Sequence, residues 1–172
     1  RQLDYYKNYI NKNIQINVVK NKEINKIRKV INKSCSILSK ILMYDDDILK
    51  YVIICRKITK RLASVPIPLI KYDEIIESEY ESETIKSLMY GLKKKYDKLL
   101  NRSISSENKE RISIIYSSIE NLKDLITENN LKWHELRVII SSSNSENVLI
   151  VNDNKIVRMA IKGYLNKLFP YK

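Results

Sequence analysis

Apolar residues return every three or four positions along several long segments, the spacing at which side chains share one face of an α-helix. The clearest segments cover about residues 21–43, 45–64, 82–100 and 105–128. Asp45, Asp46 and Asp47 are typical of a helix start, because carboxylates accept hydrogen bonds from free N–H groups there. Val65-Pro66-Ile67-Pro68 must end a helix, since proline lacks an N–H. The pattern predicts a mainly α-helical chain.

The character of the sequence changes after residue 130. Two short β-branched runs, Arg137-Val138-Ile139-Ile140 and Val148-Leu149-Ile150-Val151, flank the Ser/Asn-rich residues 141–147. Such runs around a polar connection favour a β-hairpin. A last helical pattern begins near Asn154 and ends before Pro170. We therefore expect a basic helical bundle over residues 1–130, with a small C-terminal β-hairpin and helix over 131–172 packed on it.

Composition supports the helical interpretation and narrows the environment. Only 2 Gly and 3 Pro occur in 172 residues, too few for the many tight turns of a sandwich or barrel. No apolar run approaches the ~18 residues of a membrane span. The two cysteines, Cys35 and Cys55, lie in apolar segments without a zinc-site or disulfide-scaffold pattern. We expect buried thiols in a reducing intracellular compartment, cytoplasm or nucleus.

The net charge of +12 is unevenly distributed. Residues 1–65 carry fifteen Lys/Arg against five Asp/Glu, whereas residues 66–92 carry two against six. Such asymmetry indicates a polyanionic partner or an acidic companion subunit. The alternative is that these are only solvated lysines on helix surfaces. The candidate nucleic-acid or anion-binding residues are Lys22, Lys26, Arg28, Lys29, Lys33, Arg56, Lys57, Lys60, Arg61, Lys93, Lys94 and Lys95.

The sequence contains no recognisable catalytic site. Glycine-rich phosphate loops, GxSxG and HExxH are absent, and the acidic residues between 73 and 83 do not have EF-hand spacing. The single histidine, His134, forms a His-x-x-Arg box with Arg137, which resembles one box of the tyrosine recombinases. Their second arginine box and lysine hairpin are not found. We expect a protein that is not an enzyme, with no cofactor, no metal and no small-molecule substrate.

Three functions remain open from the sequence. The first is a non-catalytic basic helical subunit that contacts nucleic acid within a larger assembly, through lysines and neighbouring tyrosines. The second is a protein–protein interaction or assembly subunit without nucleic-acid contact, docking through its helical stripes or the acidic 73–83 segment. The third is a peripheral binder of anionic, phosphoinositide-type membrane, since residues 21–43 combine an Ile/Leu face with a Lys/Arg face.

Overall fold

The computed structural model describes residues 21–80, 82–128, 130–142 and 154–168. All seven elements in these ranges are α-helices, which confirms the predicted mainly helical character. They are α2 (Lys22–Ile41), α3 (Asp46–Ser64), α4 (Leu69–Glu79), α5 (Ile85–Leu100), α6 (Ser106–Glu128), α7 (Leu131–Ser142) and α8 (Lys155–Leu168).

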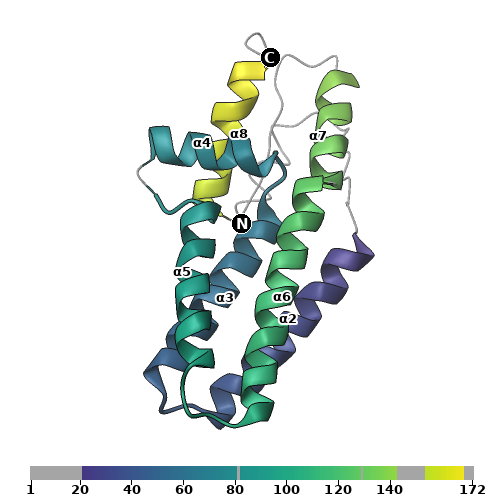
Figure 1. Cartoon of the computed structure of the whole chain (residues 1–172). Helices are drawn as coiled ribbons and strands as arrows, with labels where there is room; N and C mark the ends of the chain where they lie inside the picture. Colours follow the sequence, from purple (N-terminus) through teal and green to yellow (C-terminus); the bar gives the residue numbers. More distant parts are fainter. Residues whose placement is uncertain (1–20, 81, 129, 143–153, 169–172) are drawn as a thin grey trace, which may run out of the picture.

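Helices α2, α3, α5 and α6 lie side by side and form the body of a bundle (Figure 1). α3 packs against the other three, α4 lies across one end of the bundle, and α8 packs against α4. A single apolar core joins α2 to α6 and α8. Its fully buried members include Ile31, Leu38, Ile58, Leu92 and Ile115. Burial of these side chains supplies the main driving force for assembling the helices.

Local sequence signals explain where the helices begin. The Asn21 side chain accepts hydrogen bonds from the N–H groups of Glu23 and Ile24, both at 3.0 Å. Asp45 caps α3 in the same way, which confirms the predicted helix start at the three aspartates. The start of α5 is capped twice, since Thr84 accepts the Ser87 N–H at 3.0 Å and Asp73 of α4 accepts the Ile85 N–H at 2.7 Å. This last contact fixes the short α4 against the bundle.

The predicted β-hairpin is wrong. Residues 137–140, expected as its first strand, lie within α7, and no strand occurs among the described residues; the second expected strand, 148–151, lies outside them. The Asn130 side chain caps α7 by accepting the Trp133 N–H at 3.1 Å. Ile140 is buried in the helical arrangement. The helix cap and this burial together favour the helix more than the modest strand preference of the β-branched residues favours a strand.

Candidate functional site

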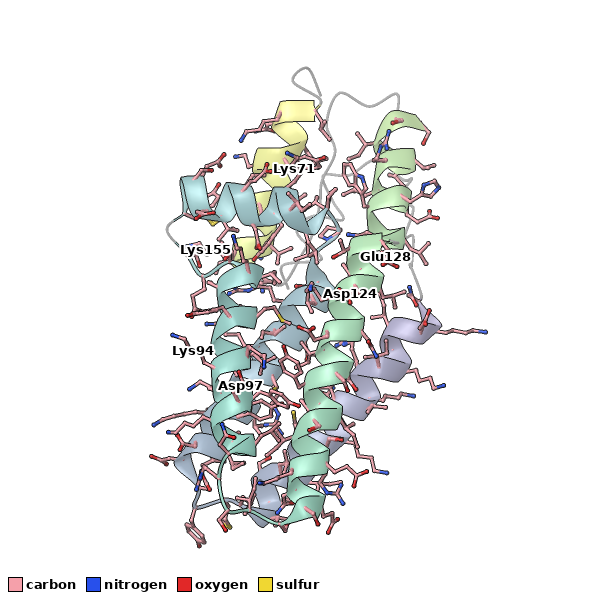
Figure 2. The ribbon with its side chains drawn as sticks, viewed as in Figure 1. Lys71, Lys94, Asp97, Asp124, Glu128 and Lys155 are labelled. Atoms are coloured by element: carbon pink, nitrogen blue, oxygen red, sulfur yellow. The ribbon has the colours of Figure 1, made fainter. Side chains whose placement is uncertain are left out.

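One face of α2 carries a continuous row of lysines. Four predicted binding residues fall on this row, and the structure adds a fifth, Lys40. At 100° per residue these positions lie within about 60° of one another, and they extend over about 27 Å. All five side chains are exposed, and nitrogen-tipped side chains project outward from α2 (Figure 2). We call Lys22, Lys26, Lys29, Lys33 and Lys40 the α2 stripe.

The α2 stripe lacks the acidic partners that other cations of the chain have. Lys71, Lys98 and Lys167 each lie within 3.1 Å of a carboxylate oxygen. By contrast, no α2 stripe lysine forms a salt bridge with any residue that the structure describes. Glu23, the only acidic residue of α2, lies three residues before Lys26, but the two side chains form no salt bridge. Among the described residues, the stripe is therefore a linear array of positive charge without ion pairs.

The opposite face of α2 is occupied by the core. Ile31 and Leu38 are fully buried, and Ile24 and Ile27 pack against the same core. Because this apolar face holds the bundle together, it is not available for insertion into lipid while the protein is folded. Adhesion of α2 to an anionic membrane by charge alone stays a prediction.

One of the predicted α3 cations borders the α2 stripe. Arg56 Nη2 lies 3.5 Å from the hydroxyl oxygen of Ser36, which is on α2 between Lys33 and Lys40. Since α3 follows α2 through a short connection and packs along it, Arg56 widens the basic surface. Lys60 is exposed one turn further along α3.

The other two α3 cations are engaged within the fold. Arg61 is only 6% exposed, and its Nη1 donates a hydrogen bond to the Glu83 carbonyl. Lys57 forms a salt bridge with the Glu83 carboxylate. Both side chains hold the segment before α5 against α3. Their position at the C-terminal half of a helix gave no sequence signal that distinguished them from the exposed Arg56.

The α5 lysines lie apart from the α2 stripe, because α3 and α6 lie between α5 and α2 (Figure 1). Lys93 pairs with Asp97 in the next turn, and Lys94 Nζ lies 4.6 Å from the centre of the Tyr90 ring. Lys95 is half-buried. Lys94 is labelled on the outer side of α5, away from α6 (Figure 2). The structure therefore separates the predicted cations into at least two surfaces.

The acidic 73–83 segment also makes contacts within the chain. Glu74 pairs with Lys71 at 2.8 Å, and Glu79 pairs with Lys167 of α8 at 3.1 Å. Asp73 caps α5, although burial raises its pKa above the ordinary value. Since Glu83 also pairs with a lysine, much of this segment's charge is compensated internally.

Arg28 is turned away from the α2 stripe. It lines a pocket of about 130 Å³ together with Lys132, a residue that the sequence did not single out. Lys40, by contrast, had a usable sequence signal, since it lies two helical turns after Lys33.

His134 is exposed on α7, and the Arg137 guanidinium lies 5.8 Å from the Trp133 ring centre. His134 and Arg137 therefore form no enclosed site.

Comparison with protein-family models, with curated proteins and with solved structures finds no match for this chain. Within the described residues, no helix is both long enough and apolar enough to cross a membrane.

Proposed function

We propose that this protein is a non-catalytic helical subunit that contacts the phosphate backbone of a nucleic acid through the α2 stripe. The observation that supports this proposal is the row of five exposed lysines, none of which has an acidic partner among the described residues. Arg56 borders the row and widens it. Nucleic-acid binding of this kind draws its affinity from displaced counterions and needs no sequence-reading motif.

A charge-neutralising variant gives the sharpest test. Lys26→Gln/Lys29→Gln/Lys33→Gln removes three adjacent charges from exposed positions without touching the core. Binding of labelled single- and double-stranded oligonucleotides is measured by anisotropy at several salt concentrations. For duplex DNA, each lost phosphate contact reduces the slope of log affinity against log salt by about 0.9, so we expect a reduction of about 3.

The matched control is Lys93→Gln/Lys94→Gln/Lys95→Gln on α5, which loses the same three charges. We expect this variant to bind with nearly the wild-type salt dependence, because α5 lies apart from the α2 stripe. Equal weakening of both variants would show that only net charge matters. Wild-type affinity that is absent at low salt, or does not fall with added salt, would contradict the proposal.

A second candidate function is docking of a protein partner at the α2–α3 connection. Ile41, Met43 and Tyr44 are 56%, 53% and 92% exposed there, an unusual concentration of large apolar side chains in one short segment. Light scattering over a range of protein concentrations compares the wild type with Met43→Ser/Tyr44→Ser. Self-association that the variant abolishes would support docking by a second copy, whereas a wild type that stays monomeric would not.

A further inference from the structure

The pocket that contains Arg28 is formed by three parts of the chain. The first two turns of α2 form one wall, the C-terminal end of α3 forms another, and the junction of α6 with α7 closes the third side. Its volume of about 130 Å³ suits one compact group. No Asp or Glu is among the described residues that line it, although two of its polar side chains carry positive charge.

Arg28 enters this pocket without a partner among the described residues. Its Nε is buried and has no hydrogen-bond acceptor there, and no described residue forms a salt bridge with its guanidinium. A guanidinium carries five N–H donors in a planar fork that matches the oxygens of a phosphate or carboxylate. Leaving a buried donor unsatisfied costs free energy, so binding of an acceptor at this site is favoured.

Lys132 is the second cation of the pocket. Its ammonium group donates one hydrogen bond to the Ala63 carbonyl at the end of α3. Burial lowers the pKa of Lys132, and the nearby charge of Arg28 lowers it further. The two cations therefore lie close enough to repel each other, and no carboxylate among the described lining residues offsets this repulsion. An anion placed between them would relieve both the repulsion and part of the desolvation penalty.

Two helix N-termini add to the positive potential. Asn21 caps α2 and Asn130 caps α7, and both residues line the pocket. The positive ends of both helix dipoles are thus at the pocket, where they favour negative charge. This contribution supplements the two side-chain cations.

From this cavity, we propose that Arg28 and Lys132 form a binding site for a single phosphate group. The site is distinct from the α2 stripe and does not depend on the function proposed for that stripe. The group can be a free phosphate or the terminal phosphate of a larger molecule, since both present the same oxygens to the two cations.

Trp133, the only tryptophan of the chain, provides a local reporter because it follows Lys132 directly. Titration of the full chain with inorganic phosphate should produce a saturable change in Trp133 fluorescence. Sodium chloride at matched ionic strength should not. Arg28→Gln should weaken the apparent affinity by about tenfold or more, as expected for loss of a charge-assisted contact. The control Lys94→Gln loses the same charge on α5, outside the pocket, and should titrate like the wild type.

A second variant keeps the test decisive if Arg28→Gln fails to fold. Asn25 lines the pocket and is exposed, so Asn25→Asp supplies an internal carboxylate with little change in shape. This variant should lose the phosphate response and should melt about 2–4 °C higher than the wild type without phosphate. An Asn25→Asp protein that responds to phosphate like the wild type would overturn the proposal.

One further arm identifies the source of the phosphate. It compares a short oligonucleotide with and without a 5′-phosphate, with Arg28→Gln as the control for each. A response to inorganic phosphate supports a site for the free anion, and a response restricted to the 5′-phosphorylated strand supports a site for a strand end. If none of the probes gives a response that depends on Arg28, the pocket is not a phosphate site.

Discussion

The Tyr51 hydroxyl donates a 2.9 Å hydrogen bond to the Ile112 carbonyl and so links α3 to α6 inside the core. Tyr72 of α4 is equally buried, but its hydroxyl has no hydrogen-bond partner among the described residues. Burial raises the pKa of Tyr72 to about 12, which keeps this hydroxyl neutral at physiological pH. Two tyrosines of the same size and burial thus differ in whether their polar atom is satisfied.

This difference predicts that the same substitution changes the free energy of unfolding differently at the two positions. Tyr51→Phe should lower the free energy of unfolding by about 1 kcal/mol, because a buried hydrogen bond is lost. Tyr72→Phe should be neutral or slightly stabilising, because it removes a desolvated hydroxyl without breaking a bond. Urea unfolding followed by circular dichroism measures both. Equal destabilisation by the two substitutions would contradict the difference in hydrogen bonding.

The ion pair between Asp45 and Arg102 should make stability depend on acid pH. The hydrogen bond from Arg102 holds the pKa of Asp45 below its ordinary value, and the N–H groups at the start of α3 add to this effect. Since the folded pKa is lowered, the stabilisation is complete above about pH 4–5 and is lost as pH falls through the folded pKa.

The variant Asp45→Asn isolates this effect, because asparagine caps a helix nearly as well but carries no charge. We expect the free energy of unfolding of the wild type to exceed that of Asp45→Asn by about 0.5–1 kcal/mol at neutral pH, because the ion pair is partly exposed. The difference should shrink when urea unfolding is repeated at pH 5, 4 and 3. A difference that is constant over this range would exclude the ion pair as its source.

The thiols of Cys35 on α2 and Cys55 on α3 are free and lie buried in the same core. The neighbouring Cys55 thiol lowers the pKa of Cys35, and burial raises the pKa of Cys55. Access rather than ionisation should limit their chemistry, because both side chains are fully buried. We expect no rapid labelling by a disulfide reagent in the native state and labelling of both cysteines in urea. Rapid native-state labelling would show that α2 and α3 separate readily.

Gly163 allows α8 to approach α4 closely. A Cβ at this position would lie 3.2 Å from Glu79 Oε2 and 3.4 Å from Ile75 Cγ2. Gly163→Ala should be neutral or stabilise by up to about 1 kcal/mol, since the carboxylate can move and alanine favours helix. Gly163→Leu should destabilise by about 1–3 kcal/mol through overpacking against buried Ile75. Thermal denaturation of both variants tests whether α8 belongs to the cooperative core.

The helices could be predicted from the sequence where apolar residues repeat at the helical spacing and this repeat determines which face is buried. In α6, Ile112, Ile115, Ile119, Leu122 and Ile126 keep a regular spacing, and all five are buried. The failure at residues 137–140 has a specific cause. The side chain of Asn130 begins a new helix two residues after α6 ends, and an Asn at the end of a helical pattern does not distinguish such a cap from a turn. Strand preference alone then favoured the wrong element.

The candidate sites also differ in whether the sequence alone could locate them. The α2 stripe follows from spacing within one helix, so the sequence is sufficient to locate it. The approach of Lys132 to Arg28 depends on folding together residues about a hundred positions apart, and no pattern in either segment indicates it. Likewise, Arg61 is buried because the chain brings the Glu83 carbonyl against α3. The spacing of residues within one helix does not predict such a long-range contact.

The side-chain amide of Asn130 forms hydrogen bonds through both its oxygen and its nitrogen. Its oxygen accepts the Trp133 N–H, while its nitrogen donates to the Ile67 carbonyl at 3.0 Å, in the turn between α3 and α4. Aspartate could replace the acceptor but not the donor, and serine is too short to reach in both directions. Position 130 therefore discriminates between side chains that are interchangeable at an ordinary helix cap. Natural variation there should be restricted to asparagine even where the neighbouring surface residues change freely.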